Sequence, residues 1–211
     1  MSGALGVGLA DWIDPARTAV VIVDMQADFA APEGPLGLAG IDLTAVPVAL
    51  AAAERLAEVA RTAGVAVIFV GLQTGAETDS PAWAERRRRL GGGGEAALCR
   101  AGEPGSAFVG PTPRTGEAVI AKIRYSGFFG TDLDAVLKAG GMDTLIVCGL
   151  TTECCVDATV RDAYQLDYHV FLAADACAAY EADLHIAALK ALALNCAIVV
   201  TVDDVTGAWR G

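Results

Sequence analysis

The sequence contains few of the residues from which metal sites are built. Among its 211 residues there are two histidines, His169 and His185, and the six cysteines include no C-x-x-C pair. Structural zinc sites require cysteine and histidine at such spacings, so we expect no bound metal. The cysteines also lack the spacing of a small disulfide scaffold, and we expect them to be reduced thiols.

Long apolar runs and an excess of positive charge are also absent. No stretch approaches the roughly 18 uncharged apolar residues of a membrane span, and the first residues, Met-Ser-Gly-Ala-Leu-Gly, do not resemble a secretory signal. The formal net charge of −11 argues against nucleic acid or an anionic membrane as a partner. Neither G-x-x-x-x-G-K-[ST] nor a strand-linked G-x-G-x-x-G occurs, so nucleotide binding by those motifs is unsupported. We therefore expect a cytoplasmic protein that uses no cofactor.

What the sequence does contain is a regular alternation of strand-like and helix-like segments. Hydrophobic residues make up 54% of the chain, and short β-branched runs bounded by turn residues are typical of buried parallel strands. The predicted strands are 18–25, 64–71, 117–123, 143–149, 168–175 and 195–202, and the predicted helices are 43–63, 132–139, 154–167 and 182–194. This pattern predicts an α/β fold: one doubly wound domain over residues 1–211, with about six mostly parallel strands and helices on both faces.

Residues 72–116 interrupt this alternation and are rich in glycine and proline. An irregular insertion of this length is usually functional or interfacial, and the sequence leaves open whether it covers a site in its own subunit or in a neighbour's. It includes the basic run Glu85–Leu90, "ERRRRL". The arginines Arg86–Arg89 could form a solvated helix face, an ion-pair patch between subunits or an anion-binding site.

Three predicted strand ends carry side chains capable of chemistry. The first strand ends in Asp24, the third runs into Lys122, and the fourth leads to Cys155. Each residue alone has an ordinary interpretation: a turn aspartate, a surface lysine and a small buried cysteine. Because the carboxyl ends of parallel strands share one edge of the sheet, we expect the three to converge there.

These residue types together make a nucleophile, a base and an electrostatic stabiliser. A cysteine attacks as the thiolate, so either its pKa must fall or a base must take its proton. A helix N-terminus and Lys122 could stabilise the thiolate and a developing oxyanion. Asp24 could accept the thiol proton and later deliver it to a leaving amine.

Two adjacent cysteines, Cys154 and Cys155, compete for the nucleophile's role. Consecutive helical residues point about 100° apart. Cys154 shares a face with Arg161 and Gln165, which looks peripheral, whereas Cys155 lies beside the apolar stripe expected to face the sheet. Helical geometry favours Cys155 without deciding the matter.

Five segments, in order, resemble the isochorismatase-like cysteine hydrolase superfamily, which includes nicotinamidases, N-carbamoylsarcosine amidases, ureidoacrylate amidohydrolases and biuret hydrolases. They are "VIVDMQADF", "GEPGSAFV", "KIRYSGFFGTDLDAVL", "DTLIVCGLTTECCVDATVRDA" and "DACAA", and together they span roughly residues 18 to 180. The resemblance implies a three-layer α/β sandwich and homodimers or homotetramers. Nicotinamidases carry Asp-x-His-x-x-His after the second strand, where this chain reads "GLQTGAETDSPAW". The resemblance is therefore to the metal-free amide and ureido hydrolases.

By position, the resemblance makes Asp24 the general acid/base, Lys122 the catalytic lysine and Cys155 the nucleophile, with Cys154 as a packing residue. It also implies a cis peptide bond between Leu150 and Thr151, and an oxyanion hole formed by the backbone N–H groups of Thr151 and Cys155. Four residues beside these positions could line the pocket: Gln26, Phe29, Tyr125 and Phe128. The two histidines lie outside the matched segments, and we interpret them as structural.

The predicted function is cysteine-dependent hydrolysis of a small amide, ureide or related C–N bond through a thioester. One alternative is a catalytically silent homologue that acts as a binding protein. Another is a hydrolase of the isochorismatase type, or of lactams, with a different substrate. A thiol redox sensor is disfavoured, because adjacent cysteines form only strained disulfides. The sequence does not identify the substrate.

Overall fold

The computed structural model describes residues 8–89 and 97–210. Within these residues six strands form one sheet in which all neighbouring pairs are parallel. In the order β3-β2-β1-β4-β5-β6, the strands are β1 (Thr18–Val23), β2 (Ala66–Leu72), β3 (Ala118–Lys122), β4 (Thr144–Leu150), β5 (His169–Ala178) and β6 (Ile198–Val200). The predicted α/β fold with about six parallel strands is confirmed.

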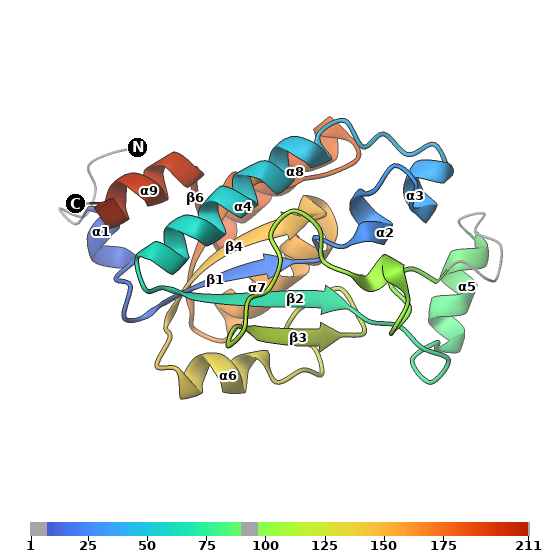
Figure 1. Ribbon diagram of the computed structural model, residues 1–211, viewed down its shortest axis with the longest axis horizontal. Helices are drawn as coiled ribbons and strands as arrows, with labels where there is room; N and C mark the ends of the chain where they lie inside the picture. Colours follow the sequence, from blue (N-terminus) through green and yellow to red (C-terminus); the bar gives the residue numbers. More distant parts are fainter. Residues whose placement is uncertain (1–7, 90–96, 211) are drawn as a thin grey trace.

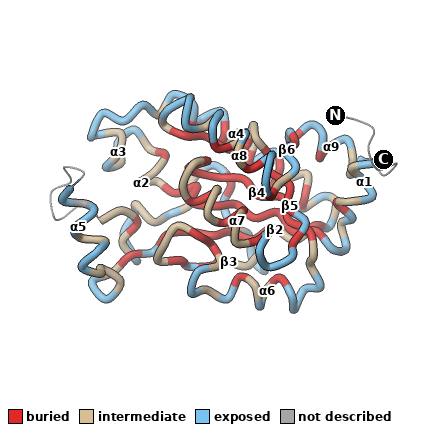
Figure 2. The backbone as a smooth tube through the Cα atoms, turned by 180° about the vertical axis from the view of Figure 1, so that it is seen from behind, coloured by how far each residue is buried: buried red, intermediate tan, exposed pale blue. Residues whose placement is uncertain are grey.

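The central strands form because their residues are apolar on both faces. Every residue of β1 and β4 is buried, as expected where helices cover both sides of a parallel sheet. Figure 2 shows β4 in the buried interior of the molecule. The edge strands are less covered, and Val119 of β3 and Ile198 of β6 are exposed. The core therefore surrounds the β1–β4 pair.

The helices lie on both sides of this sheet, and Figures 1 and 2 show α4 and α6 on opposite sides. The helices are α1 (Leu9–Trp12), α2 (Ala27–Ala30), α3 (Pro35–Leu38), α4 (Val46–Thr62), α5 (Pro81–Arg89), α6 (Leu133–Ala139), α7 (Asp157–Gln165), α8 (Ala182–Asn195) and α9 (Val202–Arg210). Helix α9 packs against α1 and α4, and α8 packs against α7. Within the described residues no helix is long and apolar enough to cross a membrane.

The last predicted strand, 195–202, was too long. β6 covers three residues, and α9 begins at Val202. The reason is a capping arrangement at the start of α9: the Asp204 N–H donates to Thr201 Oγ1, and the Thr201 N–H donates to Asp204 Oδ2. A threonine followed three residues later by an acidic residue is a helix-start signal that ends the strand.

Residues 72–116 are less irregular than predicted. Their described part, 72–89 and 97–116, contains α5 and one 3₁₀ turn, η1 (Pro104–Ser106). Helix α5 begins with Pro81, whose missing N–H is harmless in a first turn, and Ser80 Oγ accepts a hydrogen bond from the Trp83 N–H. Leu90, at the end of the basic run, lies outside the described residues.

The carboxyl ends of β1 and β4 form the point where the strand order reverses. From β1 the chain continues to β2 on one side, while β4 lies on the other; ligands bind at such switch points in open α/β sheets. At Gly149 (φ 140°) the two strands approach so closely that a Cβ would lie 2.0 Å from the Val23 carbonyl oxygen. Only glycine fits at this position. This explains why a glycine follows the apolar run of β4 and precedes the cysteine segment.

Candidate active site

Asp24 follows β1 directly and is fully buried. Its backbone turns through the left-handed region (φ 51°), which aspartate tolerates better than most residues. The Asp24 N–H donates to the Val70 carbonyl oxygen at 2.8 Å, and Oδ1 accepts from the Leu72 N–H at 2.9 Å. Two hydrogen bonds with the end of β2 therefore fix Asp24, one through its backbone N–H and one through its carboxylate.

Lys122 is the last residue of β3 and reaches past β2 to this carboxylate. Its Nζ lies 2.7 Å from Asp24 Oδ2, and the two side chains are 0% and 1% exposed. Nζ also donates to the Arg124 carbonyl oxygen at 2.9 Å and lies 3.5 Å from Cys155 Sγ. Lys122 Nζ therefore forms an ion pair with Asp24 and hydrogen bonds with the Arg124 carbonyl oxygen and the Cys155 sulfur.

Cys155 lies in η2 (Thr152–Val156), a turn of π-helix between β4 and α7. Single π turns are frequent at functional sites. The Cys155 carbonyl oxygen accepts from Thr159 Oγ1 at 2.7 Å, and this hydroxyl accepts in turn from the Gly127 N–H at 2.9 Å. The turn that holds the sulfur is thereby tied to the segment after β3. The Leu150–Thr151 peptide bond just before it is cis.

Burial and charge set the protonation of these three groups. Burial raises the pKa of Asp24, an effect that the charge of Lys122 only partly offsets. Burial alone would lower the pKa of Lys122, but the Asp24 carboxylate and the Cys155 sulfur raise it above its ordinary value. The neighbouring Cys154, burial and the Asp24 charge raise the pKa of Cys155 well above the ordinary thiol value. The raised pKa of Cys155 favours the thiol over the thiolate, so activation requires a base and does not depend on a preformed thiolate.

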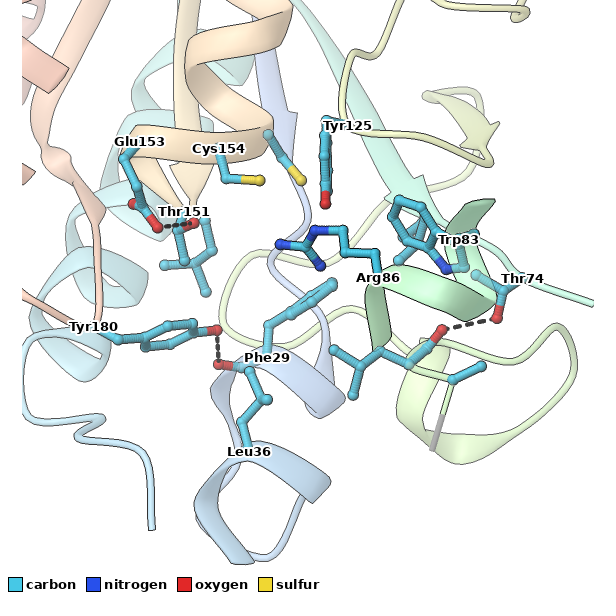
Figure 3. A pocket seen from close by; sticks show the side chains of 15 residues that line it. Phe29, Leu36, Thr74, Trp83, Arg86, Tyr125, Thr151, Glu153, Cys154 and Tyr180 are labelled. Carbon is cyan, nitrogen blue, oxygen red and sulfur yellow. Dashed lines mark hydrogen bonds between the residues drawn. The ribbon is translucent and has the colours of Figure 1, made fainter. Parts of the chain in front are cut away.

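Cys155 opens into a cavity of about 300 Å³ at the carboxyl end of the sheet (Figure 3). The lining residues are Phe29, Leu36, Leu72, Thr74, Trp83, Arg86, Ala97, Leu98, Tyr125, Leu150, Thr151, Glu153, Cys154, Cys155 and Tyr180. Most of the side chains are apolar or aromatic, as is typical of small-molecule sites. Several of these residues come from the 72–116 segment of the same chain, so that segment covers the site in its own subunit.

Cys154 also lines this cavity and is partly exposed, whereas the sequence geometry placed it peripherally. The Cys155 side chain lowers the pKa of the Cys154 thiol, which makes Cys154 a second candidate for the thiolate. The structure distinguishes the two by their partners. Cys155 Sγ lies 3.5 Å from Lys122 Nζ, the same ammonium that pairs with Asp24.

Two of the four predicted pocket residues, Phe29 and Tyr125, line the cavity, and two do not. Gln26 is fully buried, and its side-chain amide is bonded to backbone: Nε2 donates to the carbonyl oxygens of Leu72 and Ser106, and Oε1 accepts from the Leu72 N–H. It supports the strand end that holds Asp24. Phe128 packs on the core, and its ring centroid lies 5.9 Å from that of Tyr168. Neither side chain lines this cavity, because flanking positions in the sequence do not fix the direction of a side chain.

The histidines lie apart from the three chemical groups. His185 Nδ1 lies 2.7 Å from Thr152 Oγ1, so it supports the turn that contains Cys155 from behind. His169 packs edge-on against Trp12, with ring centroids 5.1 Å apart. Within the described residues no cluster of three or more histidine, cysteine or acidic residues is arranged to hold a metal ion.

Sequence reasoning missed several residues of the cavity wall. Trp83 and Arg86 project from α5, Glu153 lies in the π turn, and Tyr180 follows β5. The Tyr180 hydroxyl donates to the Phe29 carbonyl oxygen at 2.9 Å and closes one side of the cavity. Glu153 could have been found from its position two residues before Cys155. The others are brought in by loops whose paths the sequence pattern does not define.

Comparison with known proteins agrees with this architecture. The isochorismatase domain family matches residues 18–204, so the chain belongs to the isochorismatase-like cysteine hydrolase superfamily. It is 38% identical over 173 residues to the ureidoacrylate amidohydrolase of Azorhizobium caulinodans, covering 76% of this chain and 75% of that protein.

Solved structures agree as well. A cysteine hydrolase from Pseudomonas syringae pv. phaseolicola superposes with a TM-score of 0.83 at 28% identity, covering 100% of this chain and 99% of that one. The N-carbamoylsarcosine amidase from Thermoplasma acidophilum gives a TM-score of 0.72 at 28% identity, covering 89% and 97%.

Proposed function

We propose that this chain is a cysteine-dependent hydrolase of the C–N bond of a small amide or ureide. Cys155 is the nucleophile, Asp24 the general acid and base, and Lys122 the electrostatic partner of both. The observation that carries the proposal is the buried cluster in which Lys122 Nζ lies 2.7 Å from Asp24 Oδ2 and 3.5 Å from Cys155 Sγ.

In the first half of the reaction the Cys155 thiol passes its proton to Asp24 as sulfur attacks the substrate carbonyl carbon. The raised pKa of Asp24 makes it a stronger base than an ordinary carboxylate. A tetrahedral oxyanion forms. When it collapses, the C–N bond breaks and Asp24 returns the proton to the leaving nitrogen, which releases ammonia or an amine and leaves a thioester on Cys155.

In the second half a water molecule attacks the thioester carbonyl carbon. Asp24 takes a proton from the water, the C–S bond breaks, and the proton returns to sulfur. Lys122 keeps its charge throughout, because its pKa is raised, and it compensates the negative charge that moves between the carboxylate and the sulfur. All steps use groups of the chain and water.

The oxyanion is proposed to accept hydrogen bonds from the backbone N–H groups of Thr151 and Cys155, both of which line the cavity. The Thr151 hydroxyl is already engaged, since Oγ1 donates to Glu153 Oε1 at 2.8 Å. Removing one oxyanion donor typically costs about 2.7–4 kcal/mol in the transition state. These backbone donors would therefore supply a large part of the rate enhancement.

Two features support a small amide or ureide as the substrate. A cavity of about 300 Å³ lies at the lower end of the range for small-molecule sites. The relatives in the comparison are an amidohydrolase of a ureido compound and an N-carbamoyl amidase. We carry over the bond class, and leave the individual substrate to experiment.

An ammonia-release screen over small amides, ureides, carbamates, lactams and hydrazides tests the proposal. We expect turnover of at least one amide or ureide, loss of that turnover in Cys155→Ala, and retention in Cys154→Ala. Cys155→Ser should retain at most a trace. Absence of turnover across the screen would favour the silent binding protein, and full activity in Cys155→Ala would refute the assigned nucleophile.

We further propose that the enzyme is a cytoplasmic homodimer or homotetramer. All six cysteines are free thiols, which suits a reducing compartment. Exposed large apolar side chains on α8 and β6, including Leu194 and Ile198, offer a surface for a second copy. Light scattering coupled to size exclusion should give a mass of two or four chains, and a mass of one chain would contradict this.

A further inference from the structure

A cationic side chain projects into the cavity. Arg86, from the middle of α5, lines the cavity together with Tyr125 and Cys154. Figure 3 shows its guanidinium extending from the helix toward the wall that holds Thr151 and Cys154. The mechanism proposed above gives this side chain no role.

The neighbouring arginines are engaged elsewhere. Arg89 pairs with Glu85 on the same helix at 3.3 Å, and Arg100 pairs with Asp79 at 2.6 Å. Among the residues that the structure describes, no carboxylate lies within 4.0 Å of the Arg86 guanidinium. That guanidinium lies over the Tyr125 ring, with Cζ 5.8 Å from the ring centroid. A contact with a ring uses none of the five N–H donors of the guanidinium in a hydrogen bond to an acceptor atom, so they can bind a ligand.

The opposite wall is negative. Glu153 Oε1 accepts from Thr151 Oγ1, whereas Oε2 is buried and, within the described part of the chain, has no hydrogen-bond partner. A buried carboxylate oxygen of this kind calls for an N–H donor. Glu153 and Cys155 both line this cavity, so an N–H group that binds Glu153 lies in the same enclosure as the sulfur. The Tyr125 hydroxyl, on the Arg86 side, is also buried without a partner among the described residues.

With a carboxylate on one wall and a guanidinium on the other, the cavity fits a ligand that has N–H donors at one end and an anionic group at the other. N–H groups of an amide or ureide meet Glu153, which brings the adjacent carbonyl to Cys155, while a planar anion meets the guanidinium of Arg86. Arginine binds carboxylates with two parallel hydrogen bonds, and these are stronger in an apolar enclosure than in water. Because the whole chain carries a formal charge of −11, an anionic ligand depends on a local cation.

We propose that Arg86 is a specificity residue that binds a carboxylate of the substrate, so that the preferred substrates are amido acids or ureido acids and not uncharged amides. This inference rests on the proposed function for the identity of the reacting bond. It does not rest on turnover, because recognition of the anion is a binding event.

Binding to Cys155→Ser, in which the nucleophile is weakened, tests the inference separately from catalysis. Isothermal titration would compare malonamate, succinamate and glutaramate with the corresponding uncharged diamides. Each pair differs in one charged group, and the series varies its distance from the amide. At least one amido acid should bind about tenfold or more tightly than its diamide, the range expected of hydrogen bonds to a charged group.

Adding Arg86→Gln should weaken binding of that amido acid by about tenfold to a hundredfold and change binding of the diamide by less than about threefold. Arg86→Lys keeps the charge but loses the two parallel hydrogen bonds. Its affinity for the amido acid should fall between the affinities of the parent and of Arg86→Gln. Arg88→Gln, on the same helix and outside the cavity wall, is the matched control for net charge and should bind as the parent does.

Three results would overturn the inference: equal affinity for acid and diamide at every length, equal weakening of both by Arg86→Gln, or no binding of any acid. Failure of the proposed function has a different signature. In that case the unaltered chain would release no ammonia from any compound, while the dependence of amido-acid affinity on Arg86 would remain.

Discussion

Replacing Lys122 with methionine removes the cation from a buried ion pair and should destabilise the fold in a pH-dependent manner. Lys122 Nζ lies 2.7 Å from Asp24 Oδ2, and neither side chain is exposed by more than 1%. Methionine has a similar length and no charge, so the remaining carboxylate is left buried without its counter-ion. Breaking a buried pair in this way typically costs about 3–5 kcal/mol.

The size of the loss depends on whether Asp24 can take up a proton. Burial already raises the pKa of Asp24 and Lys122 opposes that rise, so the variant has a still higher pKa. Between the two pKa values the native variant binds about one proton more than the native parent, while the unfolded chains are alike. The deficit in the free energy of unfolding should therefore grow by about 1.4 kcal/mol per pH unit as the pH rises through this window. Below the window both native states are protonated at Asp24, and the deficit is smallest.

Urea denaturation of the parent, Lys122→Met and the double variant Asp24→Asn/Lys122→Met, from about pH 5 to about pH 8, measures this. The double variant removes both charges, and its deficit should be smaller and nearly independent of pH. A deficit in Lys122→Met that stays constant across the range would refute the reasoning, because it would show that no uncompensated carboxylate remains.

Three further predictions follow from the same contacts. Because burial raises the pKa of Asp24, the acidic limb of the pH profile of kcat/KM should have a pKa above the ordinary carboxyl value of about 4. Asp24→Asn should be at least about a hundredfold slower. An acidic limb at or below about pH 4 would contradict the assignment of Asp24 as the base. Gly149→Ala should lower the free energy of unfolding by about 3 kcal/mol or more, because its Cβ would lie 2.0 Å from a β1 carbonyl oxygen. Gly207→Ala, which meets nothing within 4 Å, is the thermal-denaturation control and should be neutral or stabilising. Gln26→Leu removes the Nε2 donor to the carbonyl oxygens of Leu72 and Ser106 and should cost about 1–3 kcal/mol; an unchanged urea midpoint would show that the side chain is dispensable.

The sheet could be predicted because its strands carry their own signal. Runs such as Thr18–Val23 are apolar on both faces, which fits a strand covered on two sides and few other structures. Helices of one turn, such as α2 and α3, were missed because four residues are too few for a hydrophobic period. Helix α9 was missed because its first residue continues the apolar run of β6.

The convergence of Asp24, Lys122 and Cys155 could also be predicted, since it depends on topology alone. Parallel strands bring their carboxyl ends to one edge, and each of these residues follows such an end. The protonation of the sulfur could not be predicted. The sequence allowed either a depressed thiol pKa or a base, and the neighbouring Cys154 and burial raise the pKa of Cys155 in the folded chain, which favours the base.

The selectivity of the site was the least predictable part. Arg86 belongs to a basic run that the sequence presents as four equivalent arginines. Only the packing of α5 against the mouth of the cavity separates Arg86, which lines it, from Arg89, which pairs with Glu85. This difference depends on contacts between segments that are distant in the sequence, and the local sequence pattern does not predict such contacts.

The central claim is that the acyl group of the substrate is transferred to the sulfur of Cys155. Acid quenching during turnover of a compound from the ammonia-release screen, followed by fragmentation of the peptide that contains both adjacent cysteines, measures this directly. The account predicts an acyl adduct on Cys155 that persists in Cys154→Ala and disappears in Cys155→Ala. An adduct on Cys154, or continued turnover in Cys155→Ala, would contradict it.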